Sequence, residues 1–273
     1  MKDLIIIKNK NIYVIIIMNN SSEIIEIYLN SKTADISSEL TSDVTFYIPN
    51  ITIDKNEIVY ISVKNCVFPY SWYNVNYTNN ILNYHVNGLP YTITLIKGNY
   101  NANTLREHLY NLLVSQTYPN GNDNKFTITY DIKTNKYIFS HLHHEFGFYE
   151  TSNCFELLGF SQSDKTSTNR NLTSDIMINL FPIRQIYITS NNFILNNINH
   201  TSSSNANIIT SINVVGNPHS IITYNDSSNN SHLIHNLNNI NNLNIAITDQ
   251  DGDLINFNGS HWSLTLVLTI KKI

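Results

Sequence analysis

Apolar and polar residues alternate over most of the chain, and this period of two predicts β-strands. We expect strands at residues 24–29, 44–48, 58–63, 81–86, 91–96, 126–130, 137–139, 183–188, 208–215, 220–224 and 233–240. Pro49 is expected to end the second of these, because proline cannot donate to a sheet. Asn87-Gly88 is the strongest hairpin signal, since both residues readily adopt the positive φ values that a two-residue turn requires.

The last stretch, residues 244–270, reads as two strands joined by polar turns. Ile245 and Ile247 alternate with polar or small residues until an acidic turn at 249–253. Apolar residues then restart at 254–257, and a final long strand follows from Trp262. A strand this apolar requires a sheet elsewhere in the chain, and the two strands are expected to form a hairpin.

A leucine pattern interrupts the strands after Gly98. Residues 104–107 have the Thr-x-x-Glu form of a capping box, which predicts a helix that ends before Pro119. The expected buried stripe of this helix is Leu105, Leu109, Leu112 and Leu113.

A second, shorter helix is expected at residues 154–158. Asn153 is its expected N-cap, and Gly159 its expected left-handed terminal residue.

These elements predict a mainly β protein, a single jelly-roll antiparallel β-sandwich with an α+β insertion. The expected parts are an N-terminal hydrophobic hairpin or arm at 1–20, the first part of the jelly roll at 21–97, the insertion at 98–175 and the second part of the jelly roll at 176–273. The Asn/Ser-rich residues 191–206 are expected to be an exposed loop.

The N-terminal segment contains two short apolar runs, residues 4–7 and 14–18, separated by the polar residues 8–11. Neither run is long enough to span a bilayer, and no small-residue cleavage site follows. We therefore expect a hairpin, with neither a membrane span nor secretion. Met18 is an alternative start of translation.

The amino-acid composition of the chain makes any single asparagine weak evidence for a functional site. The chain has 46 asparagines among 273 residues, only 13% charged residues and a net charge of −4. Asn, Ile, Lys and Tyr share AT-rich codons, so genome composition explains this bias. Lys and Arg are scattered, which argues against a nucleic-acid groove or an anionic-membrane surface.

The two cysteines, Cys66 and Cys154, are far apart in the sequence. They form no C-x-x-C pair, so we expect buried thiols in a reducing compartment and no disulfide framework.

His141, His143 and His144 form the densest group of potential metal ligands. On a continued strand, His141 and His143 would share one face, but Zn²⁺ requires a further ligand such as Glu145. The pattern favours an exposed polar strand end over a metal site.

Asp249, Asp251 and Asp253 resemble the start of a calcium loop. Gly252 is at the fourth position and Ser260 at the twelfth, whereas an EF-hand needs glycine at the sixth and glutamate at the twelfth. A hairpin turn is the favoured interpretation.

The remaining candidates are weaker. Arg106, Glu107 and His108 are expected on the solvated face of the helix. Four further histidines are spread over separate loops: His219, His232, His235 and His261. The aromatic loop at residues 68–77 is either an interaction surface or a cover for the end of the sandwich. We expect no catalytic, cofactor-binding or metal-ligating residue, no cofactor and no enzymatic activity.

Several motifs, in this order, resemble the minor capsid or penton proteins of virophages, polinton-like viruses and related double-stranded DNA viruses. They are SDVTFYIPNITI, VFPYSWYNVNYTNN, YTITLIKGNYNANTLREHLYNLL, FTITYDIKTNKYIFSH, CFELLGF and ITDQDGDLINFNGSHWSLTLVLTI. The resemblance covers roughly residues 42–270, and the order and spacing of the motifs carry it.

This resemblance implies a virion protein of an icosahedral capsid, with the pentameric vertex protein as the favoured role. Its partners would be further copies of itself, as a homopentamer, and the major capsid protein, with no nucleic-acid contact. The alternative is a minor cement or fibre-head protein that binds a host surface. A β-sandwich hydrolase or lectin-like enzyme is a third hypothesis, which turnover dependent on Asp249 or His143 would support.

Overall fold

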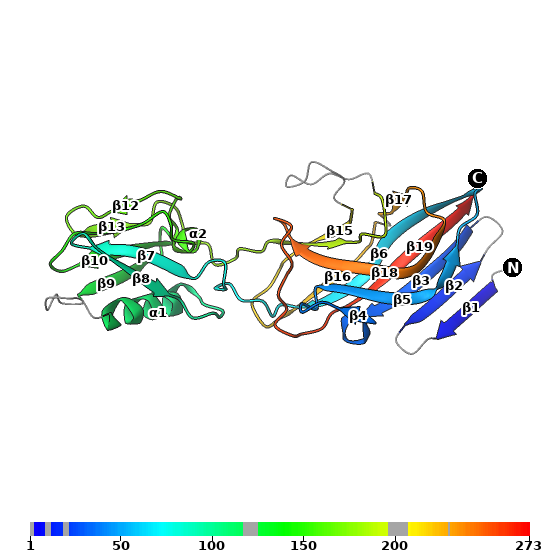
Figure 1. The fold of residues 1–273 in the computed structure, drawn as a ribbon, viewed down its shortest axis with the longest axis horizontal. Coiled ribbons are helices and arrows are strands. Elements are labelled where there is room, and N and C mark those ends of the chain that lie inside the picture. The colour runs from blue at the N-terminus through cyan, green and yellow to red at the C-terminus, as the bar shows by residue number, and fades with distance from the viewer. Residues whose placement is uncertain (1–2, 9–11, 19–21, 117–124, 196–206, 229) are drawn as a thin grey trace. The chain divides into compact units, whose positions relative to one another are not determined.

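A computed structural model describes residues 3–8, 12–18, 22–116, 125–195, 207–228 and 230–273. Within them the protein is mainly β, with antiparallel sheets and two short helical elements of α type (Figure 1). The chain divides into two compact units, Met1–Trp72 with Ile183–Ile273, and Tyr73–Pro182. Each unit has its own hydrophobic core.

Among the described residues, the longest strands lie in the first unit, together with several short ones. They are β1 (Asp3–Lys8), β2 (Tyr13–Met18), β3 (Ser22–Asn30), β4 (Ile36–Ser37), β5 (Asp43–Thr52), β6 (Glu57–Pro69), β14 (Gln185–Thr189), β15 (Ile208–Asn213), β16 (Ile221–Asn225), β17 (His232–Ile234), β18 (Asn239–Asp249) and β19 (Ser263–Lys272). A short 3₁₀ turn at Ser31–Thr33 follows β3.

The strand order of this unit is that of a jelly roll. One sheet has the order β1-β2-β3-β19-β6-β16, with β17 also on β6, and the other has the order β15-β14-β18-β5-β4. When β3, β5, β6, β14, β15, β16/β17, β18 and β19 are numbered in chain order, the sheets read 1-8-3-6 and 2-7-4-5. Two four-stranded sheets with this interleaved order define the jelly roll, so the predicted fold class is confirmed.

Trp262 links the two sheets inside the core. Its ring lies edge-on to Phe46 of β5 at 6.3 Å and beside Phe68 of β6 at 6.1 Å. Its indole N–H donates to Thr41 O at 2.7 Å, so the buried polar atom is satisfied. From Ser263 onward the alternate residues of β19 are buried, as the period of two predicts.

The C-terminal stretch differs from the expected hairpin. β18 and β19 belong to different sheets, so residues 244–270 cross from one sheet to the other. The apolar residues at 254–257 form no strand of their own, because only an isolated bridge joins Thr248 to Leu254. Ile255 and Phe257 are nevertheless buried, so their apolar pattern reflects core packing and not strand pairing.

β5 also differs from expectation, because it continues past Pro49 to Thr52. Its register against β18 shifts between Ile240 and Asn242, opposite the proline. A bulge lets a strand accommodate a residue that cannot donate, so the prediction that Pro49 ends the strand is wrong.

β1 and β2 pair antiparallel and extend the first sheet beyond β3. The turn expected between them, and residues 196–206 of the expected Asn/Ser loop, lie outside the described residues. No helix in the described part of the chain is long and apolar enough to cross a membrane.

The second unit is inserted between β6 and β14. Its elements are β7 (Ile81–Val86), β8 (Leu89–Thr94), α1 (Ala102–Ser115), β9 (Phe126–Asp131), β10 (Lys136–His141), β11 (Phe146–Phe148), α2 (Phe155–Leu158), β12 (Lys165–Thr166) and β13 (Asn171–Thr173). They form two small sheets, β12-β11-β7-β8 and β13-β10-β9.

This unit is larger than the expected insertion at 98–175. The hairpin β7–β8 was assigned to the jelly roll, but β7 pairs with β11 of the second unit. Leu82 and Tyr84 are buried in the same core as the leucines of α1. The second unit therefore begins at Tyr73 and not at the expected residue 98. The sequence pattern of a hairpin does not show which other strand pairs with its free edge.

α1 begins two residues before the predicted capping box. Asn101 is the N-cap, and its side chain accepts from the backbone N–H of Asn103 and Thr104, each at 3.0 Å. Thr104 completes the box as the third helical residue. The leucine stripe is confirmed for Leu105, Leu109 and Leu113, which are fully buried, whereas Leu112 is half-buried against the same core.

α2 is capped differently from the prediction. Cys154 is the N-cap residue, and the Asn153 side chain instead accepts from Ile81 N at 2.6 Å. Gly159 has the predicted left-handed conformation, at φ 78°.

Candidate functional site

The histidine group does not lie on one strand face. β10 ends at His141, which is buried, and His143 and His144 follow in a bend. Nδ1 of His141 accepts from the backbone N–H of His143 at 3.2 Å and of His144 at 3.0 Å. His141 therefore fixes the bend after β10.

Glu145, the expected third ligand, has other partners. Its carboxylate accepts from the backbone N–H of Arg170, at 3.0 and 3.1 Å, and from the Ser167 hydroxyl. Across the described ranges, no three His, Cys, Asp or Glu side chains gather closely enough to hold a metal ion.

The acidic stretch forms the predicted tight turn. Oδ1 of Asp249 accepts from the backbone N–H of Asp251 at 2.9 Å and of Asp253 at 3.0 Å. Burial, and then the charges of Asp253 and Asp251, raise the pKa of Asp249 despite these hydrogen bonds.

Most of the aromatic rings at residues 68–77 pack into the core. This favours a cover for the end of the sandwich over an interaction surface. Phe68, Tyr70 and Trp72 are buried, and the last two stack at 4.3 Å between ring centroids. Tyr77 is the exposed ring, with the Lys97 ammonium 3.7 Å above its centroid.

Of the polar residues expected on the helix face, two pair with each other. Arg106 and Glu107 form an ion pair at 3.1 Å. His108 was expected to be solvated, but it is half-buried, stacks on Tyr100 and accepts from Ile96 N at 3.0 Å. Burial lowers its pKa.

The remaining histidines stay apart, in separate elements. Nδ1 of His261 lies 3.3 Å from the Ser31 hydroxyl, His219 has a left-handed backbone, His232 begins β17, and His235 bridges Ile194. They form no common site.

Both cysteines are free and buried in the cores of their units. Burial raises the pKa of each thiol to about 12, so neither is a thiolate at neutral pH.

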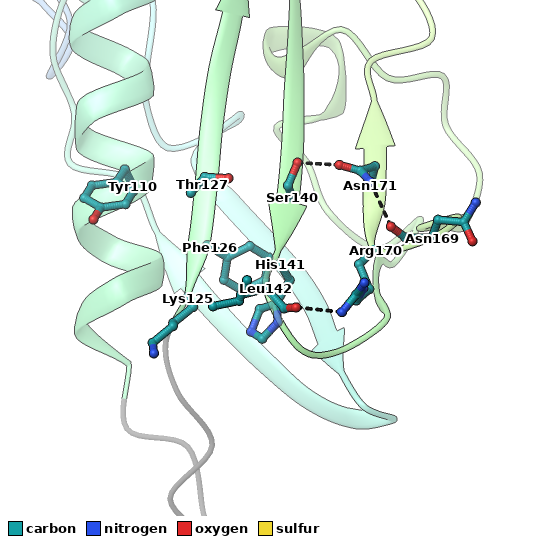
Figure 2. Close-up of a pocket in the computed structure, with 10 residues that line it drawn as sticks. All are labelled: Tyr110, Lys125, Phe126, Thr127, Ser140, His141, Leu142, Asn169, Arg170 and Asn171. Atoms are coloured by element: carbon teal, nitrogen blue, oxygen red, sulfur yellow. Dashed lines mark hydrogen bonds between the residues drawn. The ribbon is translucent and has the colours of Figure 1, made fainter.

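The second unit has an open groove of about 470 Å³ (Figure 2). It lies where β9 begins, β10 ends and the turn before β13 comes alongside. Its lining residues are Tyr110, Lys125, Phe126, Thr127, Ser140, His141, Leu142, Asn169, Arg170 and Asn171. We refer to these residues as the groove.

Strand pairing explains the polar wall of the groove. Ser140 of β10 faces Thr127 of β9 on one side and Asn171 of β13 on the other. The Ser140 hydroxyl donates to Oδ1 of Asn171 at 2.6 Å. These three side chains are on the face of the small sheet that points away from the core, so they are available to a ligand.

The turn at Asn169-Arg170 comes directly before Asn171 and lines the groove beside the polar wall. Thr168 and Asn171 pair across it, and Asn169 and Arg170 have φ values of 52° and 62°. Two positive φ values define the tight two-residue hairpin turn that favours glycine in its second position. An arginine there costs about 1–2 kcal/mol relative to glycine.

Three groups of this arginine hold it to the end of β10 and the segment that follows. Its backbone N–H donates to Glu145, its carbonyl accepts from His141 N at 3.0 Å, and Nη1 donates to Leu142 O at 2.8 Å. The guanidinium is consequently held at the groove, as Figure 2 shows.

The sequence did not predict this groove. Its residues come from α1, β9, β10 and a turn some 30 residues further along the chain, and no local motif unites them. The one local signal is the dipeptide Asn169-Arg170, which has asparagine at the first turn position and no glycine at the second.

No protein-family model matches the chain, and no curated protein matches it. Among solved structures it is similar to a crystal structure of the selenomethionine-labelled mavirus penton protein. The TM-score is 0.44 and the identity 14%, over 91% of this chain and 99% of that one. We base the function on this chain's own strand order and sequence.

Proposed function

We propose that this chain is a structural protein of an icosahedral viral capsid, and specifically its pentameric vertex protein. The observation that carries the proposal is the strand order 1-8-3-6 and 2-7-4-5, with an independent unit inserted between the third and fourth core strands. Jelly rolls of this order recur in viral capsids, and also in lectins and cupins.

The sequence motifs distinguish between these classes. They follow the order seen in penton-type minor capsid proteins over roughly residues 42–270, on both sides of the insertion. A lectin or cupin relationship would explain the sandwich but not the motifs within residues 91–160.

In this role the protein acts by assembly and not by turnover. Five copies meet through the flanks of the jelly roll in a closed head-to-tail ring, and the major capsid protein packs against the rim. Trp262 and the buried face of β19 keep each building block rigid, because they join the two sheets.

Sedimentation velocity of the full-length protein tests the proposal. We expect a species of five copies of the 31.3-kDa chain, and labelling of particle vertices by an antibody against the protein. A chain that stays monomeric and is absent from vertices would contradict it. A cement or fibre-head protein, the alternative, would bind particles or cells without forming a fivefold ring.

A further inference from the structure

We propose that the groove in the second unit binds an anionic saccharide, with the acidic group on Arg170 and the sugar hydroxyls on the polar wall. This inference rests on the groove alone and is independent of the capsid role.

The turn that carries Arg170 is the first argument. Of the described residues, three successive pairs have two positive φ values: Asn87-Gly88, Asn169-Arg170 and Asn258-Gly259. In the other two, glycine occupies the second position, where no Cβ is tolerated without strain. The two turns away from the groove thus have the unstrained sequence asparagine–glycine, whereas the turn at the groove has arginine in the strained second position. Backbone strain that is retained at a concave site indicates that the side chain there has a function.

The charge of the lining residues is the second argument. Lys125 and Arg170 line the groove, and none of its ten residues is acidic, although the chain has 20 acidic and 16 basic residues. Glu145 lies in the same network, but its oxygens accept from Arg170 N and Ser167. A guanidinium at a groove of this kind favours a carboxylate or sulfate, which its fork can bind through two hydrogen bonds.

The polar wall gives the third argument. Thr127, Ser140 and Asn171 offer hydroxyl and amide groups that both donate and accept, as sugar hydroxyls do. Tyr110 of α1 is 42% exposed at the other side and provides a ring on which the C–H face of a sugar can pack. The volume of about 470 Å³ is within the range of small-ligand sites.

Titration calorimetry with the full chain tests the inference. The probes are 3′-sialyllactose, a heparin tetrasaccharide and neutral lactose, with inorganic phosphate and a short single-stranded DNA for comparison. We expect at least one acidic saccharide to bind about tenfold or more tightly than lactose, phosphate and DNA. The first two probes then distinguish a carboxylate from a sulfate.

Replacing the arginine separates binding from folding. Arg170→Gly relieves the strained turn, so the melting temperature is expected to be unchanged or higher, while affinity falls about tenfold or more. Arg170→Lys keeps the charge without the fork and is expected to bind with intermediate affinity.

Lys133→Gln is the matched control, because this lysine lies in the exposed turn between β9 and β10 of the same unit, away from the groove. It should leave affinity unchanged. The inference is overturned if no saccharide binds, if lactose, phosphate or DNA binds as tightly as the acidic saccharides, or if Arg170→Gly binds like wild type.

Discussion

His108 shows how one side chain on the polar face of a helix can stabilise the neighbouring segment. Its Nε2 accepts from Ile96 N, and burial lowers its pKa below the ordinary value of about 6.5. The neutral form is therefore favoured in the folded state. Neutral His108 contributes its full stabilisation of the folded state at pH values above the ordinary histidine pKa. This contribution is lost as the pH falls through the lower pKa that His108 has in the folded protein.

We expect the free energy of unfolding of the wild type to fall on acidification from pH 7.5 to 5 more than that of His108→Gln, which does not titrate. Urea unfolding of both proteins at the two pH values measures the difference. His232→Gln, in a separate unit, serves as the control. Equal pH dependence of wild type and His108→Gln would show that the histidine makes no such contribution.

Asn74 joins the two ends of the second unit. Its buried amide donates to Tyr100 O at 2.7 Å and to Leu180 O at 3.2 Å, and it accepts from Tyr100 N at 2.9 Å. Removing it would leave half-buried backbone groups of Tyr100 and Leu180 without this partner, each at a cost of about 1–3 kcal/mol.

Asn74→Ala should therefore destabilise the second unit by at least about 2 kcal/mol in chemical unfolding. Asn103→Ala, at an exposed position of α1, is the control and should be neutral or slightly stabilising. A loss of less than about 0.5 kcal/mol in the free energy of unfolding of Asn74→Ala would contradict the proposal that Asn74 holds the two ends of the second unit together.

At the scale of elements, Gly147 lies at the centre of the sheet β12-β11-β7-β8. It is paired with His85 of β7 and Thr166 of β12. A Cβ at this position would lie 2.3 Å from Lys165 O and 2.4 Å from Nε2 of His85. The two neighbouring strands approach this closely only because the residue is glycine.

Gly147→Ala should cost about 1–3 kcal/mol, since the backbone of β12 must move to accept the methyl group. In Gly98→Ala the new Cβ would meet only the Tyr100 side chain at an ordinary contact distance, so that variant should differ little from wild type. Thermal unfolding of the two variants measures the contrast. Similar melting temperatures for both would show that the sheet yields at Gly147.

Elements with a strong local signal were predictable from the sequence. Asn87-Gly88 gave the hairpin β7–β8, and the leucine spacing gave α1. β11, β12 and β13 were missed, because strands of two or three residues have no measurable period. The N-cap of α1 was predicted three residues too late, at Thr104 and not at Asn101. Both residue types are good N-caps, and the local sequence does not show which one begins the helix.

Non-local pairing set the limit at the scale of the whole molecule. The jelly roll was predictable from the number of strands and the motif order, but the partners of β18 and β19 were not. The groove was beyond sequence reasoning for the same reason, since β13 reaches β10 from 30 residues away. Of its residues, only His141 was singled out, and as a metal ligand.

Among the described residues, the buried side chains of the second unit form a core cluster of their own. Asn74 also holds its two ends together through Leu180. We expect the fragment Tyr73–Pro182 to fold alone, with dispersed amide resonances and a cooperative thermal transition. A fragment with collapsed, undispersed spectra would show that this core depends on the jelly roll.

Electron microscopy of the purified protein tests whether this jelly roll is a capsid vertex protein. We expect ring-shaped particles with fivefold symmetry, in which the sandwiches surround the axis. Single 31.3-kDa particles, or assemblies of another symmetry, at concentrations where capsid proteins assemble would contradict it.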